Sequence, residues 1–155
     1  FDPHMKLVLV TPEIPWNTGA IGRTCVALNL ELILIKPYGF SLDEKSVRRA
    51  GTDYWKHFIL LDDNWQHFLD ERQPPRDALY FFEENGAQNF YTPDYDPDGY
   101  LVFGCESKGL PIAILDGLED RIFNLPMRDT RVRSLNLANV ATAVIYQAMR
   151  TQLGG

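Results

Sequence analysis

The residues of this chain that could do chemistry together are concentrated between positions 100 and 139. A short apolar run, Tyr100–Phe103, has the composition of a buried strand and leads into a glycine-bounded loop, Gly104–Pro111. A second strand-like run, Arg121–Met127, is followed by a polar turn and the helix opening Ser134–Asn139. This order gathers backbone N–H groups and small polar side chains at the carboxyl edge of a parallel sheet, where α/β proteins usually bind ligands. We therefore predict a ligand site in this stretch.

The glycine loop has a functional and an ordinary interpretation. Gly104 and Gly109 permit a close approach of the backbone to a ligand. Glu106, between them, is suited to receive an amine, a hydroxyl or a cationic centre. The ordinary interpretation is a surface loop with a solvated tip over residues 106–108. The loop alone does not decide between the two.

The helix opening also has two interpretations. Ser134 is a good N-cap, and the leucines that follow it fit core positions, so the segment could be purely structural. However, Asn136 and Asn139 place two amides on nearly the same helical face. A basic cluster suited to phosphate precedes them, although such runs are also common in solvated loops. It consists of Arg128, Arg131 and Arg133.

A second candidate turn, Asn17–Arg23, follows the first apolar run of the chain. It has neither the G-x-G-x-x-G pattern of dinucleotide-binding turns nor the Gly-Lys-Ser/Thr of a P-loop. A tight turn into a helix explains it equally well. Arg23 favours a binding role, because a cation in the first turns of a helix is disfavoured by the helix dipole.

The elements that position these groups alternate between strands and helices. Apolar runs predict strands at residues 6–10, 31–35, 58–61 and 78–82, and again around Leu101 and Ile122. Helices are predicted at 19–28, 41–50, 64–72 and 135–152, with a long irregular stretch at 83–99. This alternation predicts a single α/β domain whose parallel sheet is covered on both faces. Residues 1–4 precede Met5 and are interpreted as a tag remnant, so the domain spans 5–155.

Composition limits the class of protein. The chain has 155 residues, 45% of them hydrophobic and 23% charged, as in a folded soluble domain. No apolar run approaches the roughly 18 residues of a membrane helix. Cys25 and Cys105 lie far apart without zinc-ligand spacing, which favours reduced thiols in a cytoplasm. A net charge of −6 argues against a non-specific nucleic-acid binder but permits a local basic patch.

Taken together, three segments resemble the motifs of the SPOUT RNA methyltransferases. They are Asn17–Arg23, Phe103–Pro111, and Leu125–Met127 together with Arg133–Asn139. Residues 12–19 and 48–54 are similar to the family's minimal tRNA wobble-position ribose methyltransferases, the TrmL (YibK) group. The similarity extends from Met5 to the end of the chain. Lys108, where the family commonly has Arg, and a longer loop before Arg133 are departures from the pattern.

The resemblance implies a parallel α/β sheet whose C-terminal segment forms a deep trefoil knot. It also implies a cytoplasmic homodimer that binds S-adenosylmethionine, releases S-adenosylhomocysteine, and uses no metal and no membrane. The implied reaction is 2′-O-methylation of nucleotide 34, a cytidine or modified uridine, in the anticodon stem-loop of tRNA, leucine tRNAs in particular. The alternatives are a methyltransferase acting on another tRNA position or on rRNA, and a non-catalytic RNA-binding α/β module.

The resemblance also implies roles for individual residues. The expected cofactor pocket consists of Phe82, Gly104, Glu106, Leu125, Met127, Ser134 and Leu135. Arg23, Ser134 and Asn136 are expected near the transferred methyl as catalytic residues. Because a guanidinium essentially never loses its proton, we expect Arg23 to orient the ribose and bind a phosphate. The residues expected to contact the substrate or the dimer partner are Asn17, Arg133 and Tyr146.

Overall fold

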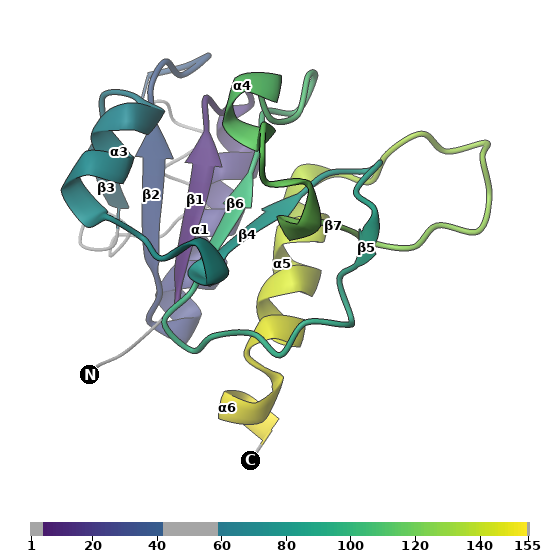
Figure 1. Ribbon diagram of the computed structural model, residues 1–155. Coiled ribbons are helices and arrows are strands. Elements are labelled where there is room, and N and C mark those ends of the chain that lie inside the picture. The colour runs from purple at the N-terminus through teal and green to yellow at the C-terminus, as the bar shows by residue number, and fades with distance from the viewer. Residues whose placement is uncertain (1–4, 42–58, 155) are drawn as a thin grey trace.

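A seven-stranded parallel sheet forms the centre of the molecule in the computed structural model, which describes residues 5–41 and 59–154 (Figure 1). Its strand order is β3-β2-β1-β6-β4-β7-β5. The strands are β1 Lys6–Val10, β2 Glu31–Ile35, β3 Ile59–Asp62, β4 Leu79–Phe82, β5 Gln88–Asn89, β6 Tyr100–Phe103 and β7 Ile122–Asn124. Every pairing between these strands is parallel, as the sequence predicts.

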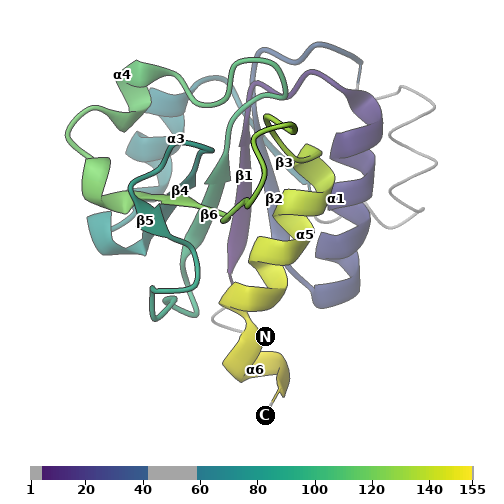
Figure 2. The same ribbon diagram turned by 90° about the vertical axis from the view of Figure 1, so that its right-hand side faces the viewer.

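Helices cover both faces of the sheet (Figure 2). They are α1 Pro15–Leu28, α3 Trp65–Arg72, α4 Ile112–Leu115, α5 Leu137–Ala148 and α6 Arg150–Gly154, with 3₁₀ turns at η2 Arg76–Ala78 and η3 Glu119–Arg121. Successive residues of β1 show the two layers, because side chains alternate between the faces of a strand. Leu9 packs in the core with α1 and α5, whereas Val8 packs in the core with Phe68 of α3. Burial on both faces explains why the strands are continuously apolar.

The predicted strands and helices are largely confirmed, with shifts at their ends. Helix α1 begins at Pro15 rather than Gly19, since proline is favoured in the first helical turn. The run predicted to reach Met127 ends as a strand at Asn124, and Pro126 lacks the N–H that would continue the ladder. The short strand β5 was not predicted. The helix predicted at 41–50 and the first residue of the strand predicted at 58–61 lie outside the described residues.

The last helix differs from its prediction at both ends. Ser134 is not its N-cap. Asn136 holds that position, and its side-chain oxygen accepts a hydrogen bond from the Asn139 N–H at 3.2 Å. The predicted continuous helix is interrupted at Met149, which separates α5 from α6.

The connection between β7 and α5 leads from one side of the sheet to a helix that packs beside α1. Helix α5 packs beside α1 (Figure 2), although β4 and β6 separate β7 from β1. Residues at both ends of this connection line the same cavity as Phe82 and Phe103, which lie at the carboxyl ends of β4 and β6. The trefoil knot expected for the C-terminal segment stays a prediction. Within the described residues, no helix is long and apolar enough to cross a membrane.

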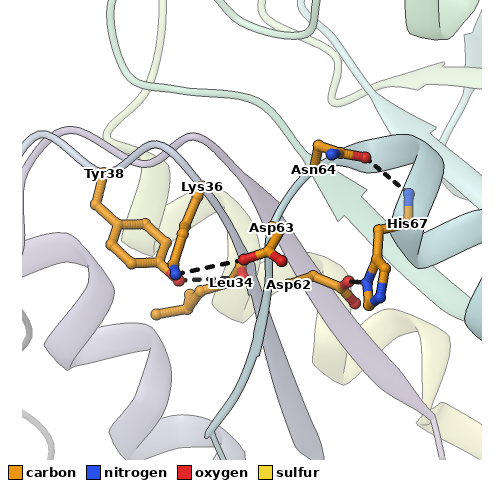
Figure 3. A network of polar contacts seen from close by, with 7 residues as sticks. All are labelled: Leu34, Lys36, Tyr38, Asp62, Asp63, Asn64 and His67. Carbon is orange, nitrogen blue, oxygen red and sulfur yellow. Dashed lines mark hydrogen bonds and ion pairs between the residues drawn. The ribbon is translucent and has the colours of Figure 1, made fainter.

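A polar network ties α3 to the carboxyl end of β3 (Figure 3). Asp62 is only 8% exposed, and its carboxylate pairs with Nδ1 of His67. Asn64 caps α3 by accepting a hydrogen bond from the His67 N–H at 2.8 Å. The hydrogen bond with Asp62 raises the pKa of His67 above its usual value. The charged form of His67 therefore strengthens the link between strand and helix.

Candidate functional site

A cavity of about 580 Å³ opens where the carboxyl ends of β4, β6 and β7 meet the start of α5. Small-molecule sites typically measure about 300–1,000 Å³. Every residue that the sequence places in the cofactor pocket lines this cavity: Phe82, Gly104, Glu106, Leu125, Met127, Ser134 and Leu135. Asn17 and Asn136 line it as well. The structure thus brings together side chains from all three motifs.

The deep wall of the cavity is apolar and aromatic. Phe82, at the end of β4, stacks on Phe103, at the end of β6, with ring centroids 5.0 Å apart and planes 17° from parallel. Leu125 and Leu135 add aliphatic surface from the connection between β7 and α5. Such walls suit a flat heterocycle.

The loop after β6 is a tight turn that only glycine permits at its two ends. Cys105 N–H donates to the Gly109 carbonyl at 3.2 Å, and Gly109 N–H donates to the Cys105 carbonyl at 3.0 Å. A Cβ on Gly104 would lie 2.0 Å from the Gly109 carbonyl carbon. Gly109 has a φ of +69°, which side-chain-bearing residues rarely adopt. The two glycines therefore fix the shape of the cavity rim.

Glu106 joins this loop to the start of α1. Its carboxylate accepts hydrogen bonds from Glu13 N–H at 2.9 Å, Ile14 N–H at 2.9 Å and Asn17 Nδ2 at 3.1 Å. Ile14 provides no side-chain cap for α1. Glu106, from a distant part of the chain, therefore satisfies N–H groups at the start of α1. The helix dipole also favours a negative charge at this end of the helix.

A reciprocal contact strengthens this junction. The Glu13 carboxylate accepts hydrogen bonds from Ser107 N–H at 2.8 Å and from Ser107 Oγ at 2.9 Å. These hydrogen bonds hold the pKa of Glu13 below its usual value. The Glu106 carboxylate thus binds the backbone of residues 13–14, and the Glu13 carboxylate binds the backbone of Ser107. We call this contact between residues 13–14 and 106–107 the loop clamp. The role of Glu106 as a cofactor contact stays a prediction, since its carboxylate serves the loop clamp while also lining the cavity.

Two asparagines extend the loop clamp to α5. Asn17 is 3% exposed, and its Nδ2 donates to the Glu106 carboxylate. This hydrogen bond orients the Asn17 side chain so that its Oδ1 faces Asn136. Asn136 Nδ2 donates to that oxygen at 3.1 Å, and Asn136 also caps α5. The series Glu106–Asn17–Asn136 therefore connects one residue from each of the three motifs.

The remaining predicted residues lie around the cavity or away from it. Ser134 is exposed on its wall. Arg133 lies in a neighbouring shallow hollow together with Met127. Arg23 is exposed on α1 and Tyr146 is exposed on α5, and neither lines the cavity.

Glu83 lines the cavity and was not anticipated from the sequence. It follows β4 directly, is half-buried, and accepts a hydrogen bond from Leu110 N–H at 3.2 Å. Burial raises the pKa of its carboxyl group above the usual value. The available signal was its position immediately after a buried strand, which many surface acids share. Among residues 5–41 and 59–154, no three His, Cys, Asp or Glu side chains gather as metal ligands would.

Comparisons with known proteins agree on one family. The model of the SpoU rRNA methylase family matches residues 4–147. A tRNA (cytidine(34)-2′-O)-methyltransferase of Saccharophagus degradans is 40% identical, and the match covers 96% of each chain. A solved structure concerning 2-OH methylation of C/U34 on tRNA superposes with a TM-score of 0.88 at 39% identity, covering 99% of this chain and 100% of that one. The SpoU methyltransferase AviRb of Streptomyces viridochromogenes, in complex with the cofactor AdoMet, gives a TM-score of 0.84 at 25% identity, covering 100% of this chain and 63% of its own.

Proposed function

Because the chain belongs to the SpoU methylase family, we propose that it is an S-adenosylmethionine-dependent 2′-O-methyltransferase of tRNA nucleotide 34, a cytidine or modified uridine. The observation that carries the proposal is the single cavity in which all three motifs meet, linked by Glu106, Asn17 and Asn136. Relatives that match over nearly their whole length and carry this activity in their names support the position on the RNA. Family membership also confirms the resemblance found in the sequence. Leucine tRNAs are the expected substrates.

The residues present fit S-adenosylmethionine. The stacked Phe82 and Phe103 and the aliphatic wall suit the adenine ring. The backbone of the glycine loop and the carboxylates on the rim suit the polar ribose and amino-acid parts. When bound, this cofactor supplies a methyl group already activated on a sulfonium. The task left to the protein is to hold the 2′-hydroxyl of the RNA nucleotide in line with that methyl and to prevent other orientations of the nucleotide.

The side chains at the start of α5 and on α1 divide these tasks. Asn136 is fixed by its hydrogen bonds to Asn17 and to the Asn139 N–H, so its side chain offers a rigid surface beside the cavity. Ser134, on the exposed wall, provides a hydroxyl that can bind the ribose. Arg23 binds the ribose or the adjacent phosphate. Arg133, next to the cavity, contacts the RNA backbone.

A homodimer is the second part of the proposal, supported by a shared exposed face of α1 and α5. The two helices pack side by side (Figure 2). Each carries partly or fully exposed residues at the same helical spacing. Trp16, 57% exposed, and Tyr146, 51% exposed, flank alanines that allow close packing. The face comprises Trp16, Ala20, Arg23 and Ala27 of α1 with Asn139, Ala143 and Tyr146 of α5 and Arg150 of α6. An exposed surface with large aromatic residues is typical of an interface.

The dimer explains why Arg23 lies outside its own cavity. In the proposed dimer, Arg23 of one subunit acts on the RNA bound at the cavity of the other subunit. Recognition of one anticodon stem-loop by a few arginines from two subunits also agrees with the net charge of −6. The tRNA substrate implies a cytoplasmic protein, and the similarity in fold to SpoU methyltransferases supports the expected knot.

The direct test is transfer of labelled methyl from S-adenosylmethionine to total tRNA that lacks this modification, followed by mapping of the labelled nucleotide. We expect label on the 2′-hydroxyl of nucleotide 34. Label at another tRNA position, or on rRNA supplied in parallel, would favour the related methyltransferases instead. Cofactor binding by calorimetry without transfer to any RNA would favour the non-catalytic module. The variant Arg23→Ala provides the matched control, since it should bind the cofactor without transferring methyl.

A further inference from the structure

Glu83 lines the cavity but belongs neither to the loop clamp nor to the expected catalytic residues. It lies at the carboxyl end of β4, directly after Phe82, whose ring forms part of the apolar wall. Its neighbour Glu84 is exposed, whereas Glu83 is half-buried. Removal of a carboxylate from water is unfavourable unless the carboxylate gains hydrogen-bond partners in exchange.

The protein itself supplies little of that compensation. Within the described residues, one hydrogen bond reaches the Glu83 carboxylate, from Leu110 N–H to Oε2 at 3.2 Å. An ionised carboxylate can accept about four hydrogen bonds. No described Lys, Arg or His side chain forms an ion pair with it. Burial accordingly raises the pKa of Glu83, and the nearby Glu84 adds to the effect.

The glycine loop is shaped around this carboxylate. A Cβ on Gly109 would lie 2.6 Å from Oε2 and 2.8 Å from Oε1 of Glu83, so any other residue would push the carboxylate out of place. Gly109 also has the left-handed backbone that its turn requires. Gly109 and Leu110 of the loop therefore lie against the Glu83 carboxylate. Among the described residues, Oε2 has a hydrogen-bond donor and Oε1 has none.

From these contacts we propose that Glu83 is a specificity residue of the cofactor site, whose carboxylate accepts a hydrogen bond from a ribose hydroxyl of S-adenosylmethionine. The inference rests on the proposed function, because it assigns a contact within the same cavity. An acidic residue near the carboxyl end of a parallel strand is a recurrent partner of ribose hydroxyls in α/β nucleotide sites. Glu106 does not compete for this role, since its carboxylate holds α1. Glu83 follows Phe82 directly, so its carboxylate lines the cavity beside the aromatic wall that would hold the adenine.

The test is calorimetric binding of S-adenosylhomocysteine and of its 2′-deoxy and 3′-deoxy analogues to the wild-type protein and to Glu83→Gln. Glutamine keeps an oxygen for the Leu110 N–H but lacks the charge. Hydrogen bonds to charged groups are worth about tenfold to a hundredfold in affinity. We expect Glu83→Gln to lose about tenfold or more for S-adenosylhomocysteine but to bind one of the deoxy analogues about as well as the wild type does.

Two further variants make the result specific. Glu84→Gln removes a charge from the same rim and should change the affinity for all three ligands by the same factor. Glu83→Asp keeps the charge but shortens the side chain. As in Glu83→Gln, its affinity should fall for S-adenosylhomocysteine but not for the deoxy analogue that lacks the hydroxyl bound by Glu83. Equal losses for the deoxy and parent ligands in both Glu83 variants would overturn the assignment and leave Glu83 a structural residue or a partner of another cofactor group. If the wild-type protein bound neither S-adenosylmethionine nor its product, the proposed function itself would fail.

Discussion

Replacement of Glu106 distinguishes a structural from a direct cofactor role for the residue at the centre of the glycine loop. Glu106→Ala removes the acceptor of three hydrogen bonds, from Glu13 N–H, Ile14 N–H and Asn17 Nδ2. These bonds go to a charged group that is only partly buried, so about 1 kcal/mol each is a reasonable value. We expect the free energy of unfolding to fall by about 3 kcal/mol. Glu106→Gln, which keeps one oxygen, should lose about half as much.

Equilibrium unfolding in urea at a fixed protein concentration measures this effect. With a denaturant dependence of about 2 kcal/mol per M, the midpoint for Glu106→Ala should fall by about 1.5 M. Affinity for S-adenosylmethionine, measured by calorimetry, should fall by no more than about tenfold, because the Glu13–Ser107 half of the loop clamp remains. Lys108→Ala on the same loop serves as the control and should change stability by less than about 0.5 kcal/mol.

The opposite pattern would refute the reasoning. If Glu106→Ala left the unfolding midpoint nearly unchanged while affinity for S-adenosylmethionine fell by more than about a hundredfold, about 2.8 kcal/mol, the carboxylate would act mainly on the cofactor. The hydrogen bonds to α1 would then be a contact that the bound cofactor replaces.

Three further perturbations test other parts of the molecule. Arg23→Ala should abolish methyl transfer to tRNA while calorimetry shows nearly unchanged affinity for S-adenosylmethionine, and an equal loss of both would contradict its role on the RNA side. Thr18→Val should raise the urea midpoint, by an amount corresponding to about 1 kcal/mol, because the Thr18 hydroxyl is buried without a hydrogen-bond partner among the described residues. A loss of stability would refute this reasoning and mean that the hydroxyl has a hydrogen-bond partner in solution. The pairing with Asp62 raises the pKa of His67, so its stabilising effect is complete below the unfolded value of about 6.5 and is lost as pH rises through the folded pKa. Thermal unfolding between pH 6 and 9 should show this loss in the wild type, and an unaltered profile in His67→Asn would show that another group causes it.

The strands and the location of the cavity could be predicted because they depend on local patterns. Apolar runs such as Lys6–Val10 and Tyr100–Phe103 are buried on both sides wherever they lie in a parallel sheet. Glycines at Gly104 and Gly109 similarly indicate a turn whose geometry other residues cannot adopt. Membership in a family then assigned the lining residues one by one, which composition and spacing alone could not do.

The partners of the polar side chains depend instead on contacts between distant segments. Glu106 and Ile14 are 92 positions apart, and no pattern near either residue indicates that one caps the helix of the other. Ser134 and Asn136 are both good N-caps, and the choice of Asn136 accompanies its bond to Asn17, 119 positions away. Glu83 was missed for the same reason, since only the folded loop brings Leu110 to its carboxylate.

Helix α1 connects the cavity to the proposed dimer face. Its buried side carries Asn17, which is bonded to Glu106 and to Asn136, and its exposed side carries Arg23. The first turn of α1 has no side-chain cap from its own residue at the N-cap position, so its placement depends on the loop clamp. A change in the glycine loop on cofactor binding would therefore act on the position of α1, and with it on Arg23 and the face shared with α5. The same three hydrogen bonds thus hold both the cavity rim and the helix that carries Arg23.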